Sequence, residues 1–400
     1  MENHQNICYL DSAATAQKPA VVIDAVEQYM RHEVATIHRW MYDLAMEGED
    51  RYRALKQRIA SHVGGKPSGV VFTQHTTGAS NLLVRALEET YAWPAGSTIL
   101  LAITEHHASI VPWQRAAKKH NRTLEYIDLD EQRDISLADI QNKRTKDVRA
   151  VVCSAVSNVT GKIHSVDKIG ARLRQCDPSP LFIVDASQAA PHMRPQSEAR
   201  QCDALYFTGH KMWALTGIGV LWLRDHLAQE LVSPETGWGA VVHVTPTETV
   251  LQWAPDKFEP GTPNMVAVIS LAAALDFLEP LWETGELQRH EHALMQQFLE
   301  ETKELRHTGK IRLIGWTEEE DLASRVGVIS WTMPEEYNPF ALGQFLAQQG
   351  IAMRVGAHCA QPLHLQYWRD ASCRISFWAS TTQQDVTRVV DALQQFFLLK

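Results

Sequence analysis

The stretch Leu181-Phe182-Ile183-Val184-Asp185 is a short apolar run that ends in a single carboxylate. Similar apolar runs precede and follow it, and helical stretches such as residues 76–88 and 109–120 separate them. The other runs lie at residues 70–73, 99–103, 148–153 and 204–207. Continuous runs that alternate with helices are typical of a mostly parallel sheet covered on both faces. The sequence therefore predicts an α/β fold around such a sheet.

The last third of the chain has a different pattern. Its apolar runs are fewer, and long helical stretches surround them. Helices are expected at residues 266–278, 288–304, 340–348 and 382–399, and strands at residues 326–331, 351–354 and 374–377. At roughly 100–200 residues per domain, the length favours two domains. We expect a large domain over residues 16–265, and a smaller α/β domain formed by residues 1–15 and 266–400.

Composition limits the partners of the protein. The 400 residues include 38 Lys and Arg against 47 Asp and Glu, for a net charge of −9. This balance argues against non-specific binding to nucleic acid or to an anionic membrane, because no positive surplus is available to neutralise phosphates. The longest apolar stretch, near residues 265–275, stops at Asp276 and is shorter than a membrane span. The first residues lack the features of a signal peptide, so we expect a cytoplasmic protein.

Six cysteines are scattered along the chain without a CxxC pair or a histidine at zinc-finger spacing. No metal site is expected from them, and without a secretory signal they should remain reduced. Most such thiols fill protein cores. Five are therefore expected to be structural, namely Cys8, Cys153, Cys176, Cys202 and Cys373.

Two polar residues follow apolar runs of the expected sheet. Asp185 alone is ordinarily a helix cap or a loop tie, and Lys211, after Tyr206-Phe207-Thr208-Gly209-His210, is ordinarily an exposed turn residue. Ligands of such sheets bind beyond the carboxyl ends of the strands. Together the two residues match pyridoxal 5′-phosphate, which needs a lysine for its Schiff base and an acid to keep its ring nitrogen protonated.

Other residues meet the remaining needs of that cofactor. Thr76-Thr77-Gly78 starts an expected helix and offers hydroxyls and backbone N–H groups to a phosphate, although helix capping is an equally natural role. Thr208 and His210 can add donors. His106 follows the run at residues 99–103 and can stack on the cofactor ring, although a lone histidine is more often structural.

These motifs together resemble the class V aminotransferase-fold enzymes of the cysteine desulfurase, or selenocysteine lyase-like, group. The resemblance covers about residues 9–390, and the compact loop before Cys359 is similar to the second subgroup. Its other motifs are Tyr9-Leu10-Asp11-Ser12-Ala13-Ala14-Thr15, Glu105-His106-His107, Ser157-Asn158-Val159-Thr160-Gly161, Asp185 with Gln188, Gly261-Thr262-Pro263-Asn264, and Arg354-Val355-Gly356-Ala357-His358-Cys359-Ala360. The resemblance implies a pyridoxal-phosphate-dependent transferase of fold type I.

The resemblance also implies a role for each matching residue. Lys211 would hold the cofactor covalently and move protons at the substrate Cα. Asp185 would pair with the ring nitrogen, and Gln188 would bond the ring oxygen. His106 would stack on the ring and act as a catalytic residue that shuttles protons. The phosphate would be held by Thr76, Thr77, Thr208 and His210, with Thr262 reaching the site of the other subunit in a homodimer. The substrate side would be lined by Arg374 as the carboxylate clamp, together with Asn158, His38 and Arg354.

Cys359 differs from the other cysteines because it lies in a polar loop fixed by Gly356 and Pro362. Nearby His358 and Arg354 are expected to favour its thiolate. The resemblance implies that this thiolate takes sulfur from L-cysteine as a persulfide, releases L-alanine and passes the sulfur to an acceptor protein.

Two alternatives remain open. One is another lyase on the same scaffold, acting on selenocysteine or cysteine sulfinate, and the other is a non-catalytic subunit that binds the cofactor. Departures from the family pattern bear on the substrate, because four tryptophans stand beside site motifs. They either pack in the core or reshape the pocket: Trp40, Trp213, Trp238 and Trp378.

Overall fold

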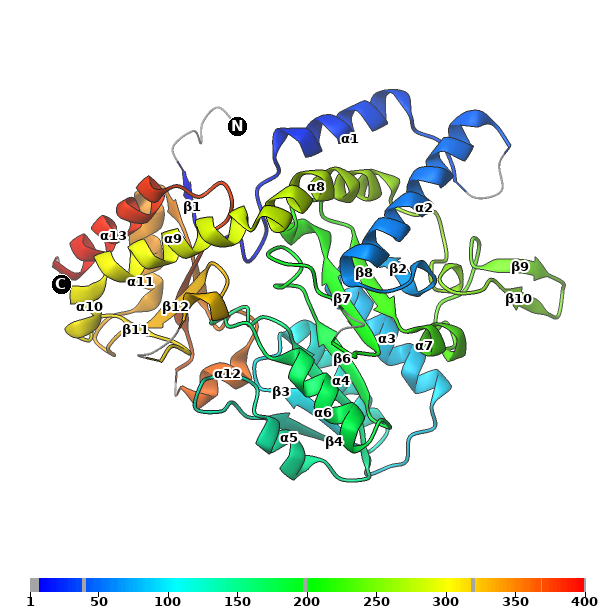
Figure 1. Cartoon of the computed structure of the whole chain (residues 1–400), viewed down its shortest axis with the longest axis horizontal. Helices are drawn as coiled ribbons and strands as arrows, with labels where there is room; N and C mark the ends of the chain where they lie inside the picture. The colour runs from blue at the N-terminus through cyan, green and yellow to red at the C-terminus, as the bar shows by residue number, and fades with distance from the viewer. Residues whose placement is uncertain (1–6, 38–40, 197–199, 318–320, 368, 399–400) are drawn as a thin grey trace.

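The computed structural model describes residues 7–37, 41–196, 200–317, 321–367 and 369–398. Its largest element is a seven-stranded sheet with the order β2-β8-β7-β6-β5-β3-β4 (Figure 1). Only β8 runs antiparallel to both of its neighbours. The strands are β2 (Val70–Thr73), β3 (Thr98–Ala102), β4 (Thr123–Ile127), β5 (Val148–Ser154), β6 (Leu181–Asp185), β7 (Ala204–Thr208) and β8 (Gly219–Leu223). The prediction of an α/β fold around a mostly parallel sheet is confirmed.

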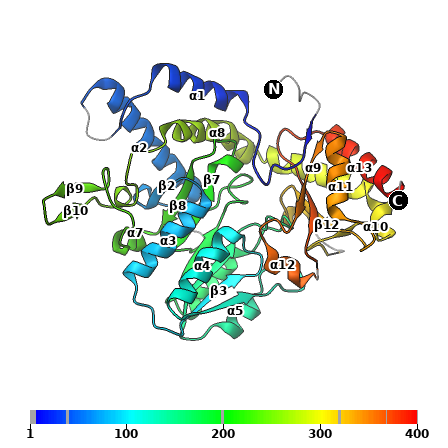
Figure 2. The ribbon, with the colours of Figure 1, turned by 180° about the vertical axis from the view of Figure 1, so that it is seen from behind.

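Helices cover both faces of this sheet, which explains why its strands are apolar on both sides. One face packs on α3 (Thr76–Thr90), α4 (His107–Lys119) and α7 (Asp225–Glu230). The helices on the opposite face are α1 (Ala20–His32), α2 (Asp43–Val63), α5 (Leu137–Lys143), α6 (Val166–Cys176) and α8 (Met265–Thr284). Figure 2 shows α3 and α4 in front of the sheet, with α1, α2 and α8 beyond one end.

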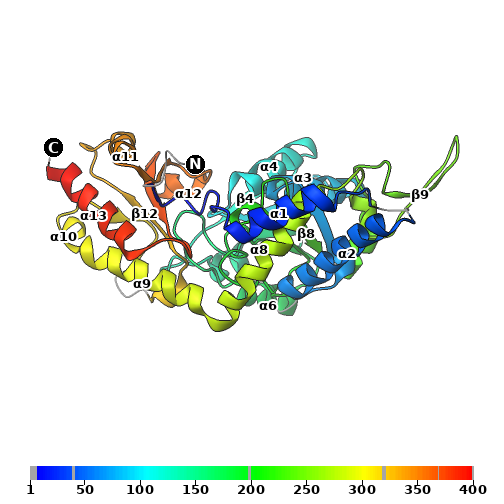
Figure 3. The ribbon, with the colours of Figure 1, turned by 90° about the horizontal axis from the view of Figure 1, so that it is seen from above.

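The last part of the chain builds a second sheet beside the first, visible in orange and red in Figure 3. Its order is β11-β12-β15-β14, and all its pairs are antiparallel. These strands are β11 (Arg312–Leu313), β12 (Val328–Thr332), β14 (Arg354–Gly356) and β15 (Ser372–Ser376). Its helices are α9 (Glu286–Glu301), α10 (Lys303–His307), α11 (Pro339–Gln348), α12 (Gln361–Gln366) and α13 (Gln383–Leu398). A separate hydrophobic core lies here, while the division at residues 15 and 265 stays a prediction.

The start of the chain is paired with this second region. Strand β1 (Cys8–Tyr9) runs parallel to β13 (Ile351–Ala352), and Asp11 forms an isolated bridge with Ser376. The backbone N–H of Ser376 also donates to the carbonyl of Leu10 over 2.8 Å. Residues 8–11 are therefore held next to β15, far from them in sequence.

Helix α8 is longer than the apolar run that the sequence suggested. It spans 20 residues, and by length and composition alone it could cross a membrane. However, 56% of its most apolar window is buried inside the protein, and its Asn264 cap accepts a hydrogen bond from Ala267 N–H over 3.2 Å. The expectation that no apolar stretch approaches membrane-span length was therefore wrong. Burial among other helices explains the apolar composition, as in core helices of large proteins.

A two-stranded hairpin, β9 (Val241–Val244) with β10 (Thr249–Leu251), projects from the end of the molecule opposite the second sheet (Figure 3). Three of its valines are more than half exposed, at 52%, 58% and 54% for Val242, Val244 and Val250. Such a run of exposed apolar side chains on a projecting hairpin is unusual for a monomer surface.

Candidate active site

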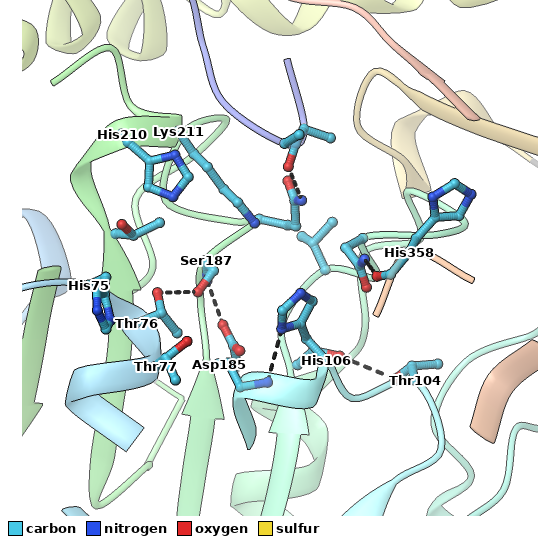
Figure 4. A pocket seen from close by; sticks show the side chains of 18 of the residues that line it. His75, Thr76, Thr77, Thr104, His106, Asp185, Ser187, His210, Lys211 and His358 are labelled. Atoms are coloured by element: carbon cyan, nitrogen blue, oxygen red, sulfur yellow. Dashed lines mark hydrogen bonds between the residues drawn. The ribbon is translucent and has the colours of Figure 1, made fainter. Parts of the chain in front are cut away.

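A cavity of about 190 Å³ opens where the central strands of the large sheet end (Figure 4). Asp185, Thr208 and Ser154 are the last residues of β6, β7 and β5, so the sheet itself brings them to this edge. Eleven predicted site residues line the cavity: Thr76, Thr77, His106, Asn158, Asp185, Gln188, Thr208, His210, Lys211, Arg354 and Arg374. The parallel-sheet rule therefore located the cavity correctly.

Lys211 ends a short 3-10 turn, Gly209–Lys211, that directly follows β7. Burial lowers the pKa of its amine to about 8, and the positive charges of Arg374 and Arg354 add to this effect, whereas Asp185 opposes it. A lysine with a lowered pKa has a larger neutral fraction at neutral pH, and the neutral amine is the form that attacks a carbonyl carbon.

Asp185 is almost completely buried, at 5% exposure. Its Oδ1 accepts a hydrogen bond from Ser187 N–H over 2.8 Å, and its Oδ2 accepts one from the Ser109 hydroxyl over 3.3 Å. The Ser109 hydroxyl is also 2.8 Å from the hydroxyl of Tyr206. Burial raises the pKa of Asp185, while Ser187 and the charge of Lys211 lower it. The carboxylate is thus fixed in orientation by neighbours on α4 and on its own loop.

The start of α3 forms another wall of the cavity. Its N-cap is His75, whose Nδ1 accepts from Gly78 N–H over 2.9 Å. Thr76 and Thr77 are therefore the first two helical residues, not the cap, and their backbone N–H groups have no intrahelical partner. The Thr76 hydroxyl is 2.8 Å from that of Ser187. A helix start of this kind binds anions such as phosphate.

His106 caps α4, because its Nδ1 accepts a hydrogen bond from Ala108 N–H over 3.0 Å. Burial lowers the pKa of its imidazole to about 3, and the charge of Lys211 contributes. Burial similarly lowers the pKa of His210 to about 4. Figure 4 shows the His106 ring and the Lys211 side chain projecting into the same cavity. Both histidines are therefore neutral near pH 7, which suits an uncharged ring-stacking role for His106.

Arg374 lies on β15, where it pairs in register with Arg354 of β14. Its Nη1 donates to the carbonyl of Asn158 over 2.9 Å, and its Nη2 donates to Oδ1 of Asp11 over 2.9 Å. Its Nε is buried and has no hydrogen-bond partner among the described residues. The guanidinium is thus held at two points and keeps its Nε hydrogen and one hydrogen on each Nη for a ligand.

The loop of Cys359 adopts an uncommon backbone conformation. His358 and Cys359 have φ angles of 49° and 59°, two consecutive non-glycine residues in the left-handed region. Outside contacts hold them there: Asn158 Nδ2 donates to the carbonyl of His358 over 2.7 Å, and His107 N–H donates to that of Cys359 over 2.8 Å. The Asn158 side chain, expected to face a substrate, thus supports this loop.

Cys359 is half-buried. It lies beside the cavity, because the preceding residue of its loop, His358, lines the cavity wall. The negative charge of a Cys359 thiolate would act on both Lys211 and Arg374. Burial raises the thiol pKa of four other cysteines, to about 12 for Cys8, Cys202 and Cys373, and well above the ordinary value for Cys153. Cys176, the remaining one, is exposed on the surface.

Two predicted residues do not line this cavity, and one lies outside the described residues. Thr262 lines a second cavity, next to the outer face of α3. Cys359 lies beside the Lys211 cavity without lining it. His38 falls outside the described residues.

The tryptophans near the motifs are mostly packing residues. Trp213 and Trp378 are buried and meet edge to face, with ring centroids 5.4 Å apart, and neither lines the Lys211 cavity. Trp238 is 47% exposed and also absent from that lining. Trp40 lies outside the described residues. For Trp213 and Trp378, the packing interpretation is therefore the better one.

Sequence reasoning missed several residues that organise the cavity. Ser187 links Asp185 to Thr76, Ser109 orients Asp185, His75 caps α3, and Asp11 holds Arg374. Ser187 could have been found from its place between Asp185 and Gln188, but the other contacts join segments far apart in sequence. No group of three or more His, Cys, Asp or Glu side chains within the described ranges is arranged to hold a metal ion.

Comparison with known proteins supports the resemblance. The aminotransferase class-V family model matches residues 8–389. A probable cysteine desulfurase of Streptomyces coelicolor is 35% identical over 393 residues, covering 97% of this chain and 91% of that protein. A cysteine desulfurase of Klebsiella pneumoniae is 35% identical over 399 residues, covering 99% and 95% of the two chains.

Solved structures agree. A cysteine desulfurase from Thermococcus onnurineus superimposes with a TM-score of 0.90 at 30% identity, covering 98% of this chain and 94% of the other. The cysteine desulfurase CsdA from Escherichia coli gives a TM-score of 0.87 at 26% identity, covering 100% and 96%. These matches extend over nearly the whole of every chain involved. The protein therefore belongs to the aminotransferase class-V family, in its cysteine desulfurase group.

Proposed function

We propose that this protein is a pyridoxal-phosphate-dependent cysteine desulfurase that converts L-cysteine to L-alanine. The observation that carries the proposal is the convergence of half-buried Lys211, buried Asp185 and the Cys359 loop on one cavity. Family membership supports the cofactor, since the relatives share the whole length of the chain.

The residues of the cavity fit the cofactor. Buried polar atoms without a hydrogen-bond partner in the described part of the chain include Gln188 Oε1, His210 Nδ1 and Arg374 Nε, all on residues that line the cavity. Unpaired buried polar atoms are costly, so their clustering indicates a bound polar ligand. Lys211 would hold the aldehyde carbon, Asp185 the ring nitrogen, and the start of α3 with Thr208 and His210 the phosphate.

Pyridoxal phosphate, when bound, supplies an electron sink that makes the substrate Cα–H acidic and its Cβ–S bond cleavable. The chain supplies everything else. Arg374 binds the substrate carboxylate through Nε and the Nη hydrogens that Asp11 and Asn158 leave free. Lys211 moves a proton at the substrate Cα, a task suited to an amine with a pKa of about 8.

Cys359 then receives the sulfur. Its thiolate attacks the substrate sulfur, a new S–S bond forms and the Cβ–S bond breaks. The electron pair of the broken bond stays on the carbon skeleton, which takes up protons and leaves as alanine. The enzyme retains a persulfide, which a second thiol, on a carrier protein or a reductant, attacks at its outer sulfur and thereby restores Cys359.

We also propose that the protein acts as a homodimer. The loop with Gly261 and Thr262 lines a cavity together with Asn81 and Arg85, on the outer side of the helix whose first turn borders the active cavity. A second copy could there add its Thr262 to the phosphate site, and the exposed valines of the β9–β10 hairpin could bury against that copy. Sedimentation of the wild type and of Thr262→Ala, with cofactor affinity measured for both, tests this; a monomer with full affinity would contradict it.

The decisive experiment incubates the cofactor-loaded enzyme with L-cysteine and a thiol reductant. We expect L-alanine as the product and, when the reductant is omitted, one additional sulfur atom on the peptide that contains Cys359. Parallel reactions with selenocysteine and with cysteine sulfinate test the alternative lyases. Faster turnover of either one, without sulfur on Cys359, would overturn the assignment to cysteine.

A further inference from the structure

Glu105 is a buried acid that the proposed mechanism does not use. It is completely buried, and its backbone N–H donates to the carbonyl of Ala102, the last residue of β3. The neighbouring strand β5 ends at Ser154, which lies in register beside Asp185 on β6. Glu105 thus lies buried between the cavity-lining residues Thr104 and His106, near the sheet edge where Asp185 ends β6.

The carboxyl groups of Glu105 and Asp185 differ in the hydrogen bonds and positive charge that stabilise their ionised forms. Both carboxyl oxygens of Glu105 are buried without a hydrogen-bond partner in the described part of the chain. Asp185, by contrast, accepts hydrogen bonds from Ser187 N–H and from the Ser109 hydroxyl, and it faces the positive charge of Lys211. Two neighbouring buried carboxyl groups do not both ionise readily, and the better-supported one keeps the charge.

Other groups around Glu105 are consistent with this difference. Burial raises the pKa of Glu105 to about 8, and the charge of Asp185 adds to the effect. Ser109 and Ser154 lie close enough to lower the pKa through weak hydrogen bonds, but neither meets ordinary hydrogen-bond geometry. Cys153 on β5 and Tyr206 on β7 are also close, and burial raises the pKa of both well above the ordinary values. Neither carries charge near pH 7, so Asp185 is the dominant anion acting on Glu105.

We propose that Glu105 is held as a neutral carboxylic acid near Asp185, so that the pair carries one negative charge and Asp185 keeps it. This inference rests on the proposed function, because Asp185 is the partner of the cofactor nitrogen. Glu105 is a positioning residue in this view. It keeps a proton, and it adds a second negative charge beside Asp185 only at alkaline pH.

Infrared spectroscopy of the holoenzyme tests the protonation state directly. A protonated carboxyl group has a C=O stretch that ionised carboxylates lack. We expect this band in the wild type near pH 7, its loss in Glu105→Gln, and its retention in the control Glu89→Gln, which changes an exposed glutamate on α3. A spectrum that is identical in the wild type and in Glu105→Gln would overturn the proposal.

A second variant provides an independent readout. Asp185→Asn removes the neighbouring anion, so the band should titrate away at lower pH than in the wild type. An unchanged midpoint would show that Asp185 does not control the proton on Glu105, and would also overturn the proposal. This variant keeps the test decisive if Glu105→Gln does not fold.

Thermal unfolding gives a third measurement without any turnover. In the unfolded chain Glu105 ionises at its ordinary pKa, whereas in the fold it holds its proton up to about pH 8, so the wild type loses stability as pH rises between these values. The Tm of Glu105→Gln relative to the wild type should therefore rise between about pH 5 and about pH 8. A pH-independent difference would contradict the proposal. None of the three readouts requires substrate, so a failed desulfurase assay leaves them valid.

Discussion

Arg374 and Asp11 form an ion pair with a 2.9 Å separation between Nη2 and Oδ1. They come from opposite ends of the chain, and the guanidinium is only 1% exposed. A buried arginine requires such a partner. The pair fixes the plane of the guanidinium of Arg374, a residue that lines the cavity.

Arg374→Lys should impair substrate binding more than folding, because an ammonium keeps the charge but loses the planar donor set. Loss of a charged hydrogen bond is worth about 1.5–3 kcal/mol, so kcat/KM for L-cysteine should fall roughly 10- to 100-fold. Asp11→Asn should reduce it less, since the amide oxygen can still accept from Nη2. Steady-state kinetics check both, and equal kcat/KM for wild type and Arg374→Lys would contradict the clamp role.

Lys211→Ala should abolish the covalent attachment of the cofactor, because no other amine is predicted to reach the aldehyde. The absorption band of the linked cofactor should disappear, and alanine release should stop. The matched control is Lys168→Ala, an exposed lysine on α6, which should keep both. An unaltered spectrum in Lys211→Ala would refute the assignment of this residue.

Cys359→Ser should retain the cofactor spectrum but lose sulfur transfer, since a hydroxyl does not form a persulfide. We expect alanine release to fall roughly 100-fold or more. Cys176→Ser, at an exposed thiol, should behave like the wild type. Product analysis with mass measurement of the Cys359 peptide distinguishes the outcomes, and undiminished release by Cys359→Ser would remove this thiol from the reaction.

Ser372→Ala should destabilise the protein, because the Ser372 hydroxyl supports the loop that carries Cys359. The buried Ser372 hydroxyl is 3.0 Å from His358 Nε2 and 2.9 Å from His364 Nε2. Its removal leaves two buried imidazoles without that partner, at a cost of about 1–3 kcal/mol in the free energy of unfolding. Urea titration measures the change, with Ser380→Ala on the surface as control. Equal midpoints for the two variants would show that the hydroxyl contributes nothing.

The protein should lose stability in acid in part through His62. This α2 histidine is fully buried, stacks on Trp282 with centroids 4.8 Å apart, and has no hydrogen-bond partner for either ring nitrogen among the described residues. Burial lowers its pKa to about 3, whereas the unfolded chain protonates near its ordinary value of about 6.5. Between these values the wild type loses up to about 1.4 kcal/mol per pH unit from this group.

His62→Phe should remove that part of the acid sensitivity and flatten the fall of the unfolding free energy between about pH 6 and about pH 4. His226→Phe, at an exposed position, should leave the slope as it is in the wild type. Chemical unfolding at several pH values compares the three proteins. The same slope in His62→Phe and in the wild type would rule out this histidine as the cause.

The sequence predicted the elements that strong local patterns specify. The apolar runs that become β2, β3, β5, β6 and β7 match the strand bounds to within a residue or so. The sequence also predicted that Asp185 and Lys211 lie at the same edge of the sheet. Strands β4 and β8 were not predicted. An apolar run does not reveal the direction in which a strand runs, so the antiparallel position of β8 between β2 and β7 could not be derived from its residues.

The missed site contacts have a common cause. Asp11 with Arg374, Ser109 with Asp185, and Asn158 with the carbonyl of His358 each join segments that only the tertiary fold brings together. A local pattern carries no information on such pairs. Likewise, Thr76 resembled a helix cap because threonine is a common one, but His75 fills that position and the Thr76 hydroxyl turns to Ser187.

The pairing of the first strand with β13 has a practical consequence for handling the protein. Within residues 8–13 the backbone and side chains hold Ser376, Arg374 and the amide of Gln188, whose Nε2 donates to the Ala13 carbonyl over 2.8 Å. Trimming the chain past Tyr9, or fusing a bulky tag tightly against Cys8, would thus disable chemistry performed hundreds of residues away. Affinity tags belong at the opposite terminus or behind a flexible spacer.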